Sequence, residues 1–240
     1  MSVEPITVLT PRKVDRAVIT QWWRNLAFLH WTVAPEVVAP LLPAGTRPDL
    51  LDGVTYVGLI GFEMDRVGPG FGVPYFGRFP ETNIRLYSVD DEGRRGVVFR
   101  SLDAARLLPV SIGRGIGLNY VWAKMRIDQL TDGSYRYRSQ RRSSSGASSD
   151  FTVKPGEKAE NTELNDFLTA RWGLHARLRG RTYYLPNEHP TWQLHEATLT
   201  HLRETLITGA GLPAPTTPPD SVLWSPGVPV RFGPPLTPHR

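Results

Sequence analysis

The feature that most constrains this fold is a series of short segments rich in Val, Ile, Tyr and Phe in the middle of the chain. Such residues favour strands, because branched and aromatic side chains pack well on a pleated surface. Asp-Gly and Glu-Gly turns separate several of the segments, and turns of this kind join antiparallel strands. We therefore expect consecutive antiparallel strands. They span residues 54–64, 83–90, 95–103, 120–130 and 134–142.

Three other segments have helical features. Residues 33–42 carry an early proline and apolar residues at helical spacing, which predicts a short helix ended by Pro43. Residues 163–173 place apolar residues on one helical face, and Gly173 is a natural C-terminal stop. Residues 195–210 fit a helical or mixed segment, and their first part fits a strand equally well.

The composition predicts one domain followed by a tail. Beyond residue 210 proline becomes frequent, as in PAPTTPPD and SPGVPVRFGPPLTPHR. Proline-rich segments favour extended conformations, so we expect residues 211–240 to wrap on the surface of the domain or to be partly disordered. Residues 1–210 then form a single domain, because no internal repeat or linker divides them.

Composition also excludes several kinds of site. The chain has no cysteine, which rules out disulfides, thiolate catalysis and cysteine-based metal centres. The six histidines are scattered, so we expect neither a metal site nor another cofactor. No apolar run is long enough to span a membrane, and the N-terminus lacks the apolar core of a signal peptide. A cytoplasmic protein is therefore the expectation.

The formal net charge of +5 raises the question of a nucleic-acid partner. Arginines and tyrosines alternate in SYRYRSQRR, at residues 134–142, and such a pattern can bind phosphates and stack bases. The alternation has period two and follows a Thr-Asp-Gly turn, which predicts the second strand of a hairpin with one solvated face. The strand explains the pattern, so we do not expect nucleic acid as the main partner.

The order of motifs along the chain resembles one known family. WRNLAFLHW is followed by PEVVAPLLPAG, DGVTYVGLIGFEM, FPETNIRLYSVDDEG, RGVVFRSLDA and GRGIGLNYVWAKM, and later by LNDFLTARWGL, HPTWQL and WSPGVPV. This order, over roughly residues 22–230, resembles the bacterial DUF2071 family, which is uncharacterised and similar to acetoacetate decarboxylase. The resemblance implies an α+β, mainly β fold: an antiparallel sheet closed into a conical barrel around a cavity, with a few peripheral helices.

In the decarboxylase branch a lysine forms a Schiff base with a 3-oxo acid, and a glutamate and an arginine help to position the substrate. The resemblance assigns this glutamate to Glu81 and a Gly-Arg segment to Gly113-Arg114, and it aligns Leu102-Asp103 with a preceding Leu-Asp pair. The segment Asn119-Tyr120-Val121-Trp122 takes the place of the lysine. The Schiff-base lysine is therefore absent from the matching position.

Lys124 is the nearest alternative nucleophile. A lysine among apolar neighbours can lose its proton near neutral pH, because desolvation penalises the ammonium. Lys124 lies two or three residues beyond the matching position, however, and strand alternation aims its side chain differently. We expect an exposed or rim lysine, since a Schiff base there requires a bulge or a register shift.

Glu81 and Arg85 are four residues apart on an expected strand, so both side chains project from the same face. If that face is the barrel interior, a carboxylate and a guanidinium line one cavity. Thr82, Ile84 and Leu86 then point the other way, toward packed helices. Two roles stay open, a ligand-orienting pair and a structural ion pair, because a buried charge needs a partner in either case.

Other candidates have two roles each as well. Arg114 suits bidentate binding of a substrate carboxylate, or it braces Asp103 or Glu81. Tyr120 is a hydrogen-bond donor or acid, or a packed residue with a satisfied hydroxyl. His30, on the expected first strand, is a satisfied core histidine or a proton shuttle. The expected ligand-binding residues are Arg85, His30, Asp103 and Trp122.

The sequence thus predicts a cavity for a small carbonyl or carboxylate compound. One hypothesis is an enzyme that uses acid–base chemistry without a Schiff-base lysine, with Glu81 as proton carrier, Arg114 as anion clamp and Tyr120 beside them. Another is a binding or sensing protein that keeps the pocket and has lost the chemistry. Nucleic-acid binding by the arginine-rich hairpin is a third alternative. Assembly into homo-oligomers stays open, since one sequence locates no interface.

Overall fold

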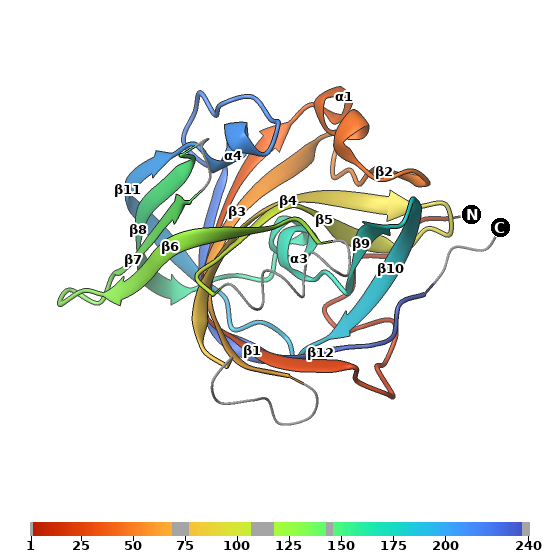
Figure 1. The fold of residues 1–240 in the computed structure, drawn as a ribbon, viewed down its shortest axis with the longest axis horizontal. Coiled ribbons are helices and arrows are strands. Elements are labelled where there is room, and N and C mark those ends of the chain that lie inside the picture. The colour runs from red at the N-terminus through yellow and green to blue at the C-terminus, as the bar shows by residue number, and fades with distance from the viewer. Residues whose placement is uncertain (1, 69–76, 107–117, 143–145, 237–240) are drawn as a thin grey trace.

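The computed structural model describes residues 2–68, 77–106, 118–142 and 146–236, and these form a predominantly β structure (Figure 1). The described strands are β1 (Ile19–Val33), β2 (Thr46–Pro48), β3 (Thr55–Gly68), β4 (Phe79–Asp90), β5 (Arg95–Ala104), β6 (Tyr120–Gln129), β7 (Tyr135–Arg141), β8 (Ser148–Lys158), β9 (Gly173–Leu178), β10 (Arg181–Glu188), β11 (His195–Glu204) and β12 (Ser221–Phe232). The described helices are α1 (Pro35–Val38), α3 (Glu163–Thr169), α4 (Leu206–Gly209) and the short 3-10 helix η1 (Ala39–Leu41).

The described strands form one sheet that closes on itself in two rings. The larger ring has nine strands in the order β5-β6-β7-β8-β11-β12-β1-β3-β4, and β4 pairs back to β5. The smaller ring leaves this path at β5 and passes through β9 and β10 to β12. Both rings share the wall β12-β1-β3-β4-β5, so this wall has one face in each ring. Figure 1 shows β7, β8 and β11 on one side of the shared wall and β9 and β10 on the other.

The larger ring encloses a filled apolar core. Side-chain alternation along β1 and β3 sends Leu29 and Leu59 into this core, where both are fully buried. From the far side, Tyr137 and Phe151 stack their rings with the centroids 4.9 Å apart. Gly61 faces these rings, and a Cβ at that position would lie 2.8 Å from Phe151. At Gly61 the core of the larger ring therefore has no room for one more methyl group.

The opposite face of the shared wall belongs to the smaller ring. Leu26 and Phe28 of β1 and Ile60 of β3 project into it. Along each strand they alternate with the side chains that point into the filled core. Helix α3 packs over this ring through Phe167 and Leu168, which are fully buried. Alternating side chains of the same strands thus supply one wall for each ring.

The expected fold class is confirmed, because the chain forms a mainly β structure closed into a barrel with few helices. The five strands expected in the middle of the chain correspond to β3, β4, β5, β6 and β7. The helix expected over residues 33–42 is confirmed as α1 followed by η1. It begins at Pro35, where the missing N–H of proline costs no intrahelical hydrogen bond.

One strand pairing differs from the expectation. β5 and β6 run parallel, with Leu102 opposite Tyr120, although the sequence predicts consecutive antiparallel strands. The segment between Ala104 and Tyr120 is too long for a tight turn, and its length allows the crossover that parallel strands need. The side chains of Ile84 and Leu86 point away from the cavity, as expected. They lie in the filled core of the larger ring, which also includes residues of the helices α1 and α4.

One helix boundary is corrected, and one segment that the sequence left open is decided. Helix α3 ends at Thr169, and Gly173 begins β9 instead of stopping the helix. Residues 195–204 form strand β11, and the helix α4 is confined to the four residues Leu206–Gly209. The segment 195–210 is therefore mixed, with a strand that pairs with β8 and β12 followed by one turn of helix.

The largest correction concerns the C-terminal segment. Ser221–Phe232 is the strand β12, which pairs along most of β1 and belongs to both rings. The expectation of a surface tail is therefore wrong for this part of the chain, and the barrel does not end at residue 210. The prolines of β12 are tolerated because its middle, between Ser225 and Arg231, pairs only with β1 among the described residues. Pro226 lies opposite Asn25, where the β1–β12 ladder skips a pair.

Candidate functional site

A cavity of about 570 Å³ lies in the smaller ring, against the shared wall. Its described lining is mainly apolar and includes Leu26, Phe28, Ile60, Phe62, Leu174, Leu185 and Trp192. Glu81 and Arg85 are the charged residues of this lining, and both lie on β4. The structure therefore places the two side chains at one cavity, as their spacing predicts.

Glu81 is only 2% exposed and has two polar neighbours. The hydroxyl of Tyr120 donates a hydrogen bond to Glu81 Oε2 at 3.0 Å, and the side chain of Asn83 also hydrogen-bonds to the carboxyl group. Burial raises the pKa of Glu81 to about 8, because a desolvated carboxylate is costly. The two hydrogen bonds oppose this rise, and the charge of Asp103 adds to it. Glu81 is therefore mostly a neutral acid at pH 7, and it can exchange a proton near neutral pH.

Tyr120 reaches Glu81 because of the parallel register between β5 and β6, which sets Tyr120 opposite Leu102. Leu102 and Tyr120 both line the cavity. Burial raises the pKa of Tyr120 well above its ordinary value, and the neighbouring Glu81 raises it further. The phenol thus stays protonated and donates its hydrogen bond to Glu81, which fixes the carboxyl group in place.

Arg85 is a buried cation without an acidic partner. Its Nε donates to the hydroxyl of Tyr87 at 3.1 Å, and its Nη2 donates to the backbone oxygen of Leu168 at 2.7 Å. Its Nη1 makes no hydrogen bond to a described residue. No described Asp or Glu lies within 4.0 Å of Arg85, and the segments outside the described residues contain no Asp or Glu in the sequence. The ion pair between Glu81 and Arg85, one of the two roles left open by the sequence, does not form.

Tyr87 links Arg85 to His30 behind the cavity wall. The hydroxyl of Tyr87 and Nε2 of His30 are hydrogen-bonded at 2.8 Å. Burial lowers the pKa of His30 well below its ordinary range, and the charges of Arg85 and Arg171 lower it further. His30 is therefore a neutral, fully buried residue, and it does not belong to the described lining of the cavity. This position supports a core histidine rather than a proton shuttle.

Asn83 is a cavity residue that the sequence analysis missed. It lies midway between Glu81 and Arg85 on β4, so the two-residue period of a strand could have identified it. Its Oδ1 is buried and has no hydrogen-bond partner among the described residues. Nε1 of Trp23, in the same lining, likewise has no described partner. Because buried polar atoms are normally paired, these two atoms favour a polar group of a ligand in the cavity.

Two expected ligand-binding residues lie elsewhere. Asp103 is on the opposite face of β5 from Leu102, and it accepts hydrogen bonds from Ser139 at 3.2 Å and from Arg141 Nε at 3.0 Å. Trp122 is 38% exposed, and its ring centroid lies 4.5 Å from the guanidinium of Arg142. Neither Asp103 nor Trp122 belongs to the described lining of the cavity.

The positions of the lysines decide whether imine chemistry fits this cavity. Lys124 lies on β6 opposite Gln140, and its side chain is exposed. The other lysines of the chain are Lys13, Lys154 and Lys158, and all three are exposed as well. None of the four lines the cavity. A Schiff-base lysine must meet its carbonyl substrate in a pocket, so no lysine of this chain fits that role.

Of the expected catalytic residues, Glu81 and Tyr120 meet at the cavity, whereas Arg114 lies outside the described residues. Three or more His, Asp or Glu side chains placed to hold a metal ion do not occur in the described parts of the chain. Among the described helices, none has the length and apolar character needed to cross a membrane.

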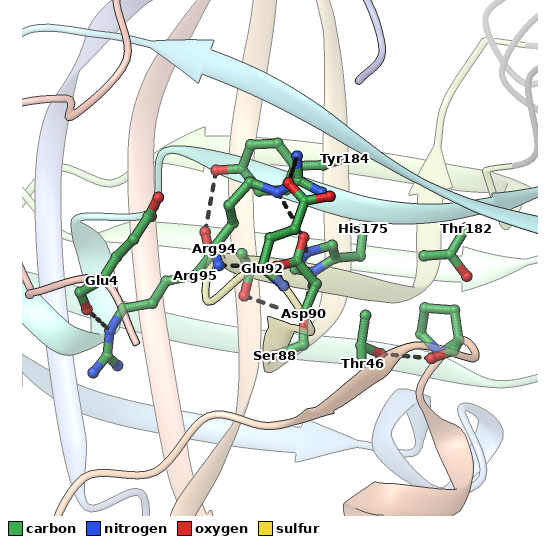
Figure 2. Close-up of polar contacts among 12 residues, drawn as sticks. Glu4, Thr46, Ser88, Asp90, Glu92, Arg94, Arg95, His175, Thr182 and Tyr184 are labelled. Atoms are coloured by element: carbon green, nitrogen blue, oxygen red, sulfur yellow. Dashed lines mark hydrogen bonds and ion pairs between the residues drawn. The ribbon is translucent and has the colours of Figure 1, made fainter. Parts of the chain in front are cut away.

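A second polar cluster lies where the β4–β5 turn meets β9 (Figure 2). Oγ of Ser88 and Nδ1 of His175 are 2.8 Å apart, and Nε2 of His175 lies 3.3 Å from Oδ2 of Asp90. These residue types are those of a catalytic triad, but Ser88 and His175 are 0% and 2% exposed and do not line the cavity. Asp90 also accepts hydrogen bonds from the side chain and the backbone N–H of Arg94. The cluster therefore fixes the turn and joins it to β9.

Most arginines of the hairpin are paired with acidic residues. Arg126 and Arg138 both pair with Asp128, at 2.5 and 2.6 Å, and Arg136 pairs with Asp150 at 2.6 Å. Exposed pairs of this kind contribute little to stability, but they neutralise charge that would otherwise bind phosphates. The pairing argues against the nucleic-acid alternative.

Solved structures with a similar fold are acetoacetate decarboxylase-like. An acetoacetate decarboxylase-like enzyme from Sphingomonas wittichii RW1 has a TM-score of 0.66 at 12% identity, over 96% of this chain and 97% of that one. Acetoacetate decarboxylase from Legionella pneumophila has a TM-score of 0.61 at 15% identity, over 95% and 92% of the two chains. The enduracididine biosynthesis enzyme MppR, complexed with pyruvate, has a TM-score of 0.63 at 13% identity, over 92% and 91%. At such identities the similarity establishes the fold and not the reaction.

Sequence comparison adds a relative and a family. The uncharacterized protein YqjF of Bacillus subtilis (strain 168) is 27% identical in an alignment of 208 residues, which covers 84% of this chain and 85% of that protein. The model of the DUF2071 family, described as an uncharacterized conserved protein, matches residues 20–229. This range contains most of the shared wall and the cavity residues of β4, and it ends just before the residues of β12 that pair with β10. The chain therefore belongs to the DUF2071 family and has an acetoacetate decarboxylase-like fold, as its order of motifs predicts.

Proposed function

We propose that the cavity binds a small carbonyl or carboxylate compound and that Glu81 exchanges protons with this compound without an imine intermediate. The observation that carries the proposal is a buried carboxyl group at the cavity wall whose pKa is raised to about 8. Such a group can donate its proton to a carbonyl oxygen and, once ionised, can remove a proton from the adjacent carbon. The complex of MppR with pyruvate, in a protein of similar fold, supports this class of ligand.

The other polar groups of β4 and β6 have distinct parts in this proposal. Arg85 offers a carboxylate of the ligand a positive charge and an Nη1 that donates to no described residue. Asn83 offers the unpaired acceptor Oδ1, and Tyr120 positions Glu81 through its hydrogen bond. The apolar lining keeps the local dielectric low, so these few polar groups act more strongly than they would in water.

A binding or sensing protein is the alternative. The absence of any lysine from the cavity favours it, because the nucleophile of the decarboxylase-like fold is missing while Arg85 and Asn83 still offer binding groups. The two functions differ in one step, the transfer of a proton at carbon. An experiment that follows this step therefore separates them.

The experiment is hydrogen–deuterium exchange at the carbon next to the carbonyl of a panel of 2-oxo and 3-oxo acids, followed by NMR in deuterated buffer. We expect the protein to accelerate exchange for a subset of the panel, and we expect Glu81→Gln to reduce the rate by about a hundredfold or more, the usual contribution of one general acid or base. Lys124→Ala is the matched control and should exchange as the unmodified protein does.

The outcomes of this experiment distinguish the alternatives. Exchange that survives Glu81→Gln would remove Glu81 as the proton carrier. Binding that depends on Arg85, in the absence of any exchange, would identify a binding or sensing protein. No binding of any oxo acid or simple carboxylate would contradict the proposed ligand class altogether.

A further inference from the structure

The size of the cavity sets the scale of its ligand. Its volume of about 570 Å³ lies in the range of sites for drug-sized molecules, which is about 300–1,000 Å³. Pyruvate or acetoacetate would leave most of this space unfilled. A ligand that fills the cavity must be several times larger.

The lining of the cavity sets the chemistry of most of this ligand. Apolar side chains come from the shared wall through Phe28 and Phe62 and from the far side through Leu174 and Leu185. Aromatic side chains add to these walls, and the indole rings of Trp23 and Trp192 stack with their centroids 6.0 Å apart. A space with such walls holds water poorly, so its filling by apolar groups is favourable.

The charged part of the described lining is confined to β4. Arg85 is 9% exposed, and no described Asp or Glu side chain lies within 4.0 Å of it. Burial keeps Glu81, two strand repeats away, mostly neutral at pH 7. The described lining thus has one positive charge without an acidic partner, and a buried cation of this kind is costly without an anion. One negative charge satisfies it, whereas a second would be buried among apolar side chains.

We propose that the ligand is a monocarboxylic acid with a large apolar body. Its carboxylate binds at Arg85, with Asn83 and Glu81 beside it, and its body of about eight or more carbons lies along the apolar walls. This inference rests on the proposed function, because it places the ligand in the same cavity, and it adds the class of compound. It also separates this chain from a site for short oxo acids.

The test is a series of straight-chain carboxylates, from butanoate through hexanoate and octanoate to decanoate, titrated against the full chain by isothermal calorimetry. Quenching of tryptophan fluorescence gives a second signal, since Trp23 and Trp192 line the cavity. We expect the affinity to rise about threefold to fourfold for each added methylene group, at least as far as octanoate. Acetoacetate and pyruvate should bind at least about a hundredfold more weakly than decanoate, by the same increment.

Charge controls accompany the series. Octanol and octanedioate should each bind at least about tenfold more weakly than octanoate, because the alcohol lacks the carboxylate and the diacid buries a second charge. Arg85→Met should abolish the preference of octanoate over octanol, and the exposed Lys124→Met is the matched control that also removes one positive charge. If Arg85→Met does not fold, Leu26→Phe fills part of the cavity and should shorten the chain length at which affinity stops rising.

The outcomes separate this inference from the proposed function. If acetoacetate or pyruvate binds as tightly as decanoate in an Arg85-dependent manner, the large apolar body is wrong and the proposed function stands. If affinity rises with chain length but octanol binds as well as octanoate, the carboxylate is wrong. If no acid of any length binds, the inference and the proposed function fail together.

Discussion

The two rings share one wall, but the interior of the larger ring is filled and the interior of the smaller ring contains a cavity. In the larger ring, the stacked rings of Tyr137 and Phe151 lie so close to Gly61 that this position has no space for a side chain. In the smaller ring, the other face of the same strands borders a cavity of about 570 Å³. The difference arises from what faces the shared wall, because β7 and β8 supply large aromatic rings on one side while β9 and β10 leave a space on the other.

The two rings also differ in whether a buried arginine is paired with an acidic residue. In the larger ring, Arg141 pairs with Asp103 at 2.9 Å, and both side chains are buried. In the smaller ring, Arg85 lines the cavity and has no acidic partner in the part of the chain that the structure describes. In a closed core a buried charge is paired with an opposite charge of the protein. In a binding site a buried charge can stay unpaired until a ligand of opposite charge binds. Four predictions test this comparison.

The largest effect is expected from replacing the two buried arginines by methionine. Arg141→Met leaves the carboxyl group of Asp103 buried without its cation and should destabilise the protein by about 3–5 kcal/mol. Arg85→Met should be neutral or stabilising by about 1 kcal/mol or more, since no acid loses a partner and Tyr87 still donates to the Leu168 oxygen. Urea unfolding measures both free energies. Equal destabilisation by the two changes would contradict the assignment of Arg85 to a ligand.

The next effect comes from two leucines of the same strand. Leu29 points into the filled core and Leu26 into the cavity, and both are buried. Leu29→Ala should cost about 3–5 kcal/mol, because it opens a void in a close-packed interior. Leu26→Ala should cost at least about 1 kcal/mol less, since Leu26 lacks packing partners on its cavity side. If the two costs are equal in denaturant unfolding, the cavity is closed in solution.

A smaller effect concerns pH. Between about pH 4.5 and pH 8 the folded protein retains a proton on Glu81 that the unfolded chain loses, so this residue makes stability fall as pH rises through the window. Glu81→Gln removes this loss, and the stability of the unmodified protein relative to the variant should fall by at most about 1.4 kcal/mol per pH unit. Thermal unfolding of both proteins across this range measures the difference. A difference that is flat with pH would mean that Glu81 has an ordinary pKa.

The smallest effect is expected at Lys124, on the exposed face of β6. Lys124→Ala should change the free energy of unfolding by less than about 0.5 kcal/mol, because an exposed lysine away from the cavity makes few contacts. Borohydride reduction with acetoacetate should give no adduct on this residue by peptide mapping. An adduct on Lys124 would show that the strand turns this side chain inward and would restore the imine mechanism.

Local patterns predicted much of the site. The spacing of Glu81 and Arg85 placed both on one face of a strand, and the same rule, applied to Asn83, would have added the residue between them. Alternation did not show which face borders a cavity. Tyr120 reaches Glu81 through a parallel register, and Asp103 meets Arg141 across the larger ring, so both partnerships depend on pairings between distant segments.

The C-terminal strand shows why some features stayed beyond sequence reasoning. Pro226 and Pro229 suggest an extended tail, yet both belong to β12, because pairing with β1 offers backbone partners that a local propensity does not include. The sequence by itself determined the strand-rich fold class, the lack of cysteine chemistry and the order of motifs that marks the family. Only the tertiary structure decided that every lysine is outside the cavity and that Arg85 has no acid beside it. The physical reason is that burial and charge pairing are properties of neighbours in space, which strands far apart in the chain bring together.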